Sequence, residues 1–144
     1  MVQSWDLSDA RAIATGVRPD EWRLLVTVRP NVLLEGAHET TDLIVGEAMG
    51  FLPTPHATWC GAPPRGDRPA TLFVRSISAL DRDQQHSLFN WLDAPGDRVQ
   101  VISTTSEPLY PMVDRGVFLE SLYYRLNVMR LDIAMAQDRP LDVL

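Results

Sequence analysis

The chain has 144 residues, of which 45% are hydrophobic and 22% charged, as in a single globular domain able to bury a core. Thirteen basic residues stand against nineteen acidic ones, and the net charge of −6 argues against a broad nucleic-acid or anionic-membrane surface. All thirteen basic residues are Arg, so no Schiff-base lysine, pyridoxal-phosphate anchor or phosphate-loop lysine can come from this chain.

The N-terminus and the single cysteine predict the compartment. Residues 1–11 contain no apolar run, which argues against a signal peptide, and the longest apolar stretches fall far short of the roughly 20 residues that span a bilayer. Cys60 has no partner for an internal disulfide, and a lone thiol is typically a small buried hydrophobe. We therefore expect a cytoplasmic protein without a membrane segment, with residues 1–144 forming one domain.

Strand-like and helix-like segments alternate along the chain. Helices are expected at residues 18–29 (beginning at Pro19 or Asp20), 42–49, 81–92 and 119–126. Strands are expected at residues 31–35, 56–60, 71–75, 98–104 and 127–133. Residues 36–41 are predicted to form a turn, and the proline-rich stretch 51–69 is irregular except for its short strand. Asp81 and Asp83 suit the start of a helix, on which Gln84 and Gln85 are predicted to face outward.

This alternation predicts an α/β fold, a three-layer sandwich with about five mainly parallel strands flanked by helices. In such folds, ligands bind beyond the carboxyl ends of the strands. The connections that follow the predicted strands are therefore the place to look for a site.

One block of sequence resembles a known family. Residues 118–128 read F-L-E-S-L-Y-Y-R-L-N-V and resemble F-R-x-D-L-Y-Y-R-L-N-V of the AAA+ ATPase domain of sigma-54-dependent transcription activators. Weaker likenesses lie upstream: residues 32–36 resemble V-L-I-x-G, residues 71–80 resemble T-L-F-L-D-E-I-G-E-L, residues 85–92 resemble Q-x-x-L-L-x-x-L, and residues 101–106 resemble V-I-A-T-T-N. The resemblance covers about residues 20–133 and implies a P-loop-NTPase-like fold.

The phosphate-binding motif of that family is altered. A P-loop reads G-x-x-x-x-G-K-[ST], so that bare amides and a lysine hold the phosphates and a hydroxyl binds magnesium. In that frame Gly36 is kept and Thr40 precedes the altered positions, Thr41 replaces the second glycine, Asp42 replaces the lysine and Leu43 replaces the hydroxyl. Exchanging the lysine for Asp42 turns the attraction of a phosphate into repulsion, and two unit charges about 4 Å apart interact by roughly 4 kcal/mol at an effective dielectric constant near 20. The altered motif therefore disfavours bound ATP or ADP with magnesium, and no cofactor or metal is expected.

The other motifs that the resemblance implies are altered as well. Arg75 and Ser76 stand where the family has its Asp-Glu pair, and Ser106 stands at the sensor asparagine. Leu119 replaces the first of two finger arginines, so only Arg125 remains. The G-A-F-T-G-A loop that contacts the sigma factor in that family is absent between residues 43 and 70, and we expect no C-terminal helical lid after the fifth predicted strand. Together these departures predict an AAA+ domain that has lost its ATPase machinery.

Other sites are disfavoured by the residue pattern. The three histidines share no metal-ligand spacing with a carboxylate or with Cys60, and no G-x-S-x-G elbow is present. Arg75 is either an ordinary surface arginine or the partner of Asp42 in an internal ion pair. Of Tyr123 and Tyr124, one ring is expected in the core and one at the edge.

Three hypotheses follow for the function. The first is a catalytically inactive interaction module linked to transcription regulation, which binds an intact AAA+ relative or a second copy through Phe118, Tyr123, Tyr124 and Arg125. The second is residual ATP or ADP binding with weak or partner-assisted hydrolysis, using Gly36, Thr40, Thr41 and Arg125. The third is an unrelated small ligand in the same cleft, because a fold does not settle a function.

Overall fold

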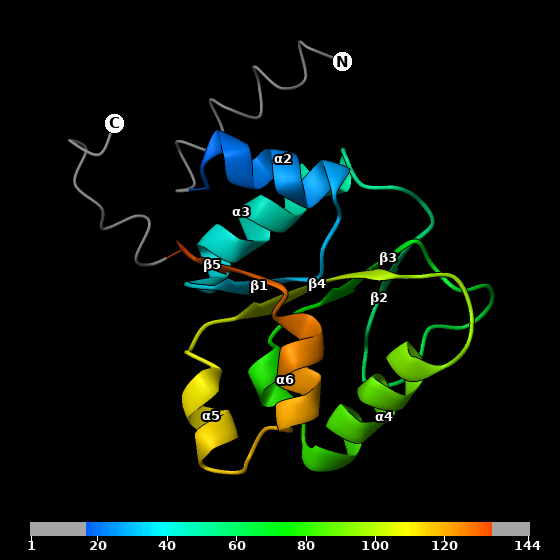
Figure 1. Ribbon diagram of the computed structural model, residues 1–144, viewed down its shortest axis with the longest axis vertical. Coiled ribbons are helices and arrows are strands. Elements are labelled where there is room, and N and C mark those ends of the chain that lie inside the picture. Colours follow the sequence, from blue (N-terminus) through cyan, green and yellow to red (C-terminus); the bar gives the residue numbers. More distant parts are fainter. Residues whose placement is uncertain (1–16, 134–144) are drawn as a thin grey trace.

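The computed structural model describes residues 17–133, which form three layers (Figure 1). The middle layer is a five-stranded, all-parallel sheet in the order β2-β3-β4-β1-β5. Its strands are β1 (Val32–Glu35), β2 (His56–Thr58), β3 (Thr71–Val74), β4 (Gln100–Thr105) and β5 (Met129–Asp132). The predicted fold class is thereby confirmed, with every strand pair parallel.

Helices cover both faces of the sheet (Figure 1). Two lie on one face, α2 (Pro19–Thr27) and α3 (His38–Met49). The other face carries the 3₁₀ helix η1 (Ile77–Ala79), α4 (Arg82–Asp93), α5 (Tyr110–Asp114) and α6 (Glu120–Leu126). Each of the four predicted helices is present, and α5, which begins at a Tyr-Pro pair, is an addition.

Alternate residues of the central strands pack into two separate cores. On β1, Val32 and Leu34 join Trp22 of α2 and Ile44 of α3, whereas Leu33 joins the helices of the opposite face. All four β1 residues are buried, as expected for a strand covered on both faces. The sheet is therefore held between two apolar layers, and polar groups gather at the two edges where the strands begin and end.

The carboxyl edge contains the point where the chain changes direction. After β1, helix α3 leads over one face to β2, whereas after β4 the chain leads under the other face to β5. Because β1 and β4 are neighbours, their carboxyl ends flank the crevice at which open α/β sheets bind ligands. The connections after these two strands define the candidate site.

Three local predictions were wrong. Residues 38–41 are helical rather than part of a turn, because α3 begins at His38. Gln85 is 1% exposed, and its amide group donates to the Leu80 and Val117 carbonyls and accepts from the Leu119 N–H. Cys60 is exposed, since it lies in the irregular loop after β2.

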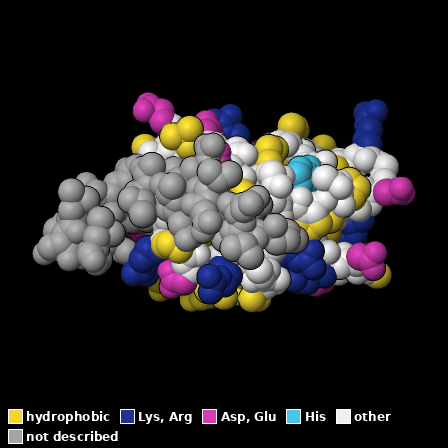
Figure 2. Space-filling model, turned by 90° about the horizontal axis from the view of Figure 1, so that it is seen from above, with side chains coloured by type: hydrophobic (Ala, Val, Ile, Leu, Met, Phe, Trp, Pro, Cys, Tyr) yellow, Lys and Arg dark blue, Asp and Glu magenta, His cyan; other side chains and the backbone are white. Residues whose placement is uncertain are grey.

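The surface of the described part mixes charges. Figure 2 shows basic and acidic side chains near one another along the margin of the face it presents. Between residues 17 and 133, no helix combines the length and the apolarity needed to cross a bilayer.

Candidate functional site

The connection from β1 to α3 is only two residues long. Gly36 and Ala37 separate the strand, which ends at Glu35, from the first helical residue, His38. The Gly36 N–H donates to the Thr105 carbonyl oxygen at 2.9 Å, so β1 and β4 stay hydrogen-bonded beyond their last paired residues. No extended loop lies between strand and helix at this position.

The helical start commits backbone groups that a phosphate loop leaves free. The N–H groups of Thr40 and Thr41 both donate to the Ala37 carbonyl oxygen at 3.0 Å. Thr41 is fully buried, and its Oγ1 donates to the His38 carbonyl oxygen at 3.2 Å. A phosphate cradle needs consecutive unpaired N–H groups that converge on one point. Here two of those groups are already bonded, and the Thr41 side chain occupies the interior.

Asp42 and Arg75 form a two-pronged ion pair. Arg75 follows β3, and its Nε donates to Asp42 Oδ1 at 3.0 Å while its Nη2 donates to Asp42 Oδ2 at 2.7 Å. The internal ion pair weighed for these residues is therefore present, joining α3 to the end of β3. Their side chains remain 44% and 57% exposed, so solvent screens the pair and its contribution to stability is about 0–1 kcal/mol.

The ends of β3 and β4 are tied together by side-chain hydroxyl groups. Ser76 adopts a left-handed conformation with φ of 54°, and its N–H donates to Thr104 Oγ1 at 3.1 Å. Thr105 Oγ1 donates to the Glu107 carbonyl oxygen at 2.8 Å. Ser106 is exposed next to this turn. Of the predicted site residues after β3 and β4, Arg75 and Ser76 make specific contacts, and Ser106 is open to solvent.

Glu35, which the sequence analysis did not single out, is the buried charged residue of this edge. Its side chain is 6% exposed at the end of β1, and its Oε2 accepts the Leu109 N–H at 3.2 Å. Leu109 is the residue before α5, so the carboxylate anchors the chain that leaves β4. The sequence did contain a signal for this residue, because Glu35 is a charged residue at the end of an apolar strand and directly before Gly36.

The predicted interface residues divide into buried and exposed. Phe118 and Tyr123 are 2% and 4% exposed and belong to the core, so the expectation that they meet a partner is wrong for the folded chain. Tyr124 is 57% exposed, which confirms that one tyrosine of the pair is buried and the other lies at the edge. The rings of Tyr110, Tyr123 and Tyr124 touch in series, with centroids 5.8 and 5.2 Å apart.

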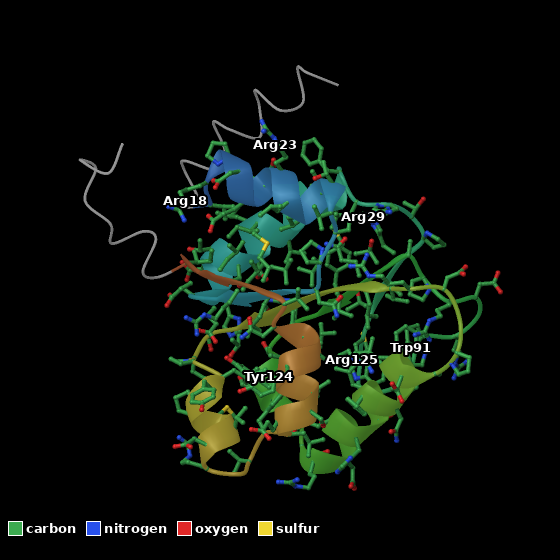
Figure 3. All side chains as sticks on the ribbon, viewed as in Figure 1. Arg18, Arg23, Arg29, Trp91, Tyr124 and Arg125 are labelled. Carbon is green, nitrogen blue, oxygen red and sulfur yellow. The ribbon has the colours of Figure 1, made fainter. Side chains whose placement is uncertain are left out.

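Arg125 lies at the opposite edge of the sheet from Gly36. Its Nη2 donates to Asp93 Oδ1 at 2.6 Å and its Nη1 donates to the Leu92 carbonyl oxygen at 3.3 Å, both at the end of α4. Figure 3 shows Arg125 near Trp91, on the side where the strands begin. The structure therefore does not bring Arg125 together with Gly36, Thr40 and Thr41 within one chain.

Comparison with known proteins agrees with this architecture. An all-parallel sheet with this strand order and with helices on both faces defines an AAA+ P-loop-NTPase-like fold. Two structures of NtrX from Brucella abortus share this fold. The match to the complex with ATP has a TM-score of 0.64 at 16% identity and covers 87% of this chain and 35% of the NtrX chain. The match to the complex with ADP has a TM-score of 0.62 at 18% identity and covers 78% of this chain and 33% of the NtrX chain.

The sequence comparisons agree with this fold. The family model of the Sigma-54 interaction domain matches residues 65–135, which supports a domain of this AAA+ type. Relatives include the sigma54-dependent transcriptional regulator SfnR of Pseudomonas fluorescens, 35% identical over 55% of this chain and 21% of that protein. The acetoin catabolism regulatory protein of Cupriavidus necator is 34% identical over 72% of this chain and 18% of that protein. The chain thus spans about a fifth of the length of these curated relatives.

Proposed function

We propose that this sigma-54-activator-like domain does not hydrolyse ATP and acts as a protein-binding module in transcription regulation. The observation that carries the proposal is the start of α3 at His38, which commits the Thr40 and Thr41 N–H groups and leaves no loop around a phosphate. The bidentate Asp42–Arg75 pair supports it, because a carboxylate and its own partner occupy the place of a phosphate-binding lysine. The relative SfnR is named a sigma54-dependent transcriptional regulator, which supports a role in transcription regulation in the cytoplasm.

The exposed apolar residues support a protein as the partner. Tyr110 and Tyr124 are 49% and 57% exposed on α5 and α6, and their rings rest on the buried Tyr123. We call these three residues the tyrosine cluster. Tyrosine is enriched at protein interfaces because a large rigid ring is buried at small entropic cost. The proposed partner is an intact AAA+ relative or a second copy of this chain.

The test mixes the purified chain with an intact sigma-54 activator and follows phosphate release. The chain alone is expected to release no phosphate above the buffer rate. The rate of the intact activator is expected to change with a saturable dependence on the chain, and Tyr124→Ser is expected to weaken that dependence. Val28→Ser serves as the control, because Val28 is a similarly exposed apolar residue (60%) at the end of α2, on the opposite layer.

Two results would overturn the proposal. Magnesium-dependent phosphate release by the chain alone would establish hydrolysis, which is the alternative function. An unchanged activator rate, together with a chain that stays monomeric at high concentration, would remove the protein-binding role.

A further inference from the structure

A hollow lined by arginines lies at the amino edge of the sheet, away from the candidate site. It has a volume of about 240 Å³ and opens between the end of α4 and the starts of the strands. Arg68, Arg98 and Arg125 line it from three separate segments of the chain. A second hollow of about 220 Å³ shares Arg98 and adds Arg29. Figure 3 shows Arg29, Trp91 and Arg125 on this same side of the molecule.

Two of these arginines are held in place by the end of α4. Arg68 donates from Nε to the Asp97 carbonyl oxygen at 3.1 Å, from Nη1 to Trp91 O at 3.0 Å and from Nη2 to Leu92 O at 3.3 Å. Its guanidinium also stacks 4.3 Å from the centre of the Trp91 ring. The last turn of α4 contains no basic residue, so Arg68 and Arg125 supply the positive charge that a helix C-terminus favours. Both side chains are thus preorganised at the wall of the hollow.

Donors and positive charge remain after these contacts. A guanidinium has five N–H groups, of which the hydrogen bonds above use three on Arg68, and Arg98 uses one to bond the Arg29 carbonyl oxygen. Four arginines line the two hollows, and two aspartates lie beside them: Asp97 lines the first hollow and Asp93 binds Arg125. Four positive against two negative side chains leave an excess of two positive charges, in a chain whose net charge is −6.

We propose that this amino-edge hollow binds a phosphate monoester. Such a group carries about −1.5 to −2 charges at pH 7 and offers three acceptor oxygens, which match the charge excess and the spare guanidinium donors. Arginine forks recognise phosphate with two parallel hydrogen bonds, and preorganisation by α4 reduces the entropy lost on binding. Since the guanidinium groups themselves compensate the phosphate charge, this binding needs no magnesium.

The test titrates the protein with inorganic phosphate at constant ionic strength, without magnesium, by calorimetry and by the NMR signals of the arginine Nε–H groups. Saturable binding with shifts of a few arginine signals is expected, and Arg98→Gln is expected to weaken it about tenfold. Arg82→Gln is the matched control: Arg82 is also exposed and also donates to one backbone carbonyl, that of Gly116, but at the other end of α4. It should leave the affinity unchanged.

Two further titrants identify the source of the phosphate. Stronger binding of AMP than of a phosphoserine peptide would assign the site to nucleotides, and the reverse order would assign it to a phosphorylated side chain. Absence of saturable phosphate binding, or equal losses in Arg98→Gln and Arg82→Gln, would overturn the site. Neither result touches the proposal of an inactive domain, which concerns magnesium-dependent binding at the other edge.

Discussion

The two edges of the sheet differ in how their polar groups are used. At the carboxyl edge, Asp42 pairs with Arg75, Gly36 bonds Thr105 and Glu35 bonds Leu109. At the amino edge, Arg68 and Arg98 retain unused donors beside a hollow. Open α/β sheets bind ligands at the carboxyl edge by topology, but binding also requires groups that the protein itself leaves unsatisfied. Among residues 17–133, the spare guanidinium donors of Arg68 and Arg98 lie at the opposite, amino edge.

Arg68→Ala should have the largest effect on stability, at the amino edge. It removes three charge-assisted hydrogen bonds and the stacking on Trp91, and we expect a loss of about 2–3 kcal/mol. Urea unfolding measures the change. Arg82→Ala, which removes one exposed contact, should cost under about 1 kcal/mol, and equal costs for the two variants would show that the end of α4 does not depend on Arg68.

Glu35→Ala tests whether the carboxyl edge is tied together by its buried carboxylate. The Leu109 N–H would lose its acceptor inside the protein, and an unsatisfied buried donor costs about 1–3 kcal/mol. Glu35→Gln keeps an acceptor of the same shape and should cost clearly less in the same unfolding measurement. If Gln and Ala cost the same, the hydrogen bond to Leu109 is not what holds this edge.

Gly96→Ala should disturb the arginine hollow through the backbone. Gly96 has a φ of 144°, and an added Cβ would lie 3.1 Å from Arg68 Cδ. We expect a loss of about 1 kcal/mol and weaker phosphate binding. Gly66 also has a positive φ, of 83°, but a Cβ added there would meet nothing within 4 Å. We therefore expect Gly66→Ala to lower the thermal unfolding temperature by a similar amount and to leave phosphate binding unchanged. Unchanged phosphate binding in both variants would mean that the position of Arg68 does not matter for phosphate binding in the hollow.

Arg75→Ala should have the smallest effect. The pair with Asp42 is about half exposed, so a double-mutant cycle of Arg75→Ala and Asp42→Ala should give a coupling energy below about 1 kcal/mol that shrinks in high salt. A coupling above about 2 kcal/mol would mean that the pair is a main support of the carboxyl edge.

The sequence predicted the fold well and the site in part. Strands β1 and β3 are short and mainly apolar, and helices or proline-rich loops separate the five strands, so the strand positions followed from pattern alone. The start of α3 was misplaced because the whole of residues 36–41 was assigned to a turn, whereas His38, Glu39 and Thr40 contain no helix breaker. Gln85 was placed outside because its polarity was read without its three hydrogen bonds to backbone groups.

The amino-edge cluster could not be read from the sequence. Arg68, Arg98 and Arg125 lie about 30 residues apart along the chain and meet only because α4 ends where β4 begins. The Asp42–Arg75 pair was within reach of sequence reasoning, since Asp42 lies in α3, which follows β1, and Arg75 follows β3, so both lie at the carboxyl edge. Local pattern therefore reveals contacts between groups that follow parallel strands but not clusters that depend on the packing of a helix end.

The central claim is that the carboxyl edge is closed, which means that its polar groups are already bonded within the protein and do not bind a nucleotide with magnesium. The most direct test is a calorimetric titration with ATP and ADP, with and without magnesium, on the parent chain and on Arg98→Gln. The closed edge predicts that magnesium adds no binding, and that any weak magnesium-independent heat is lost in Arg98→Gln. Saturable magnesium-dependent binding that persists in Arg98→Gln and disappears on substitution of Gly36 would contradict the account.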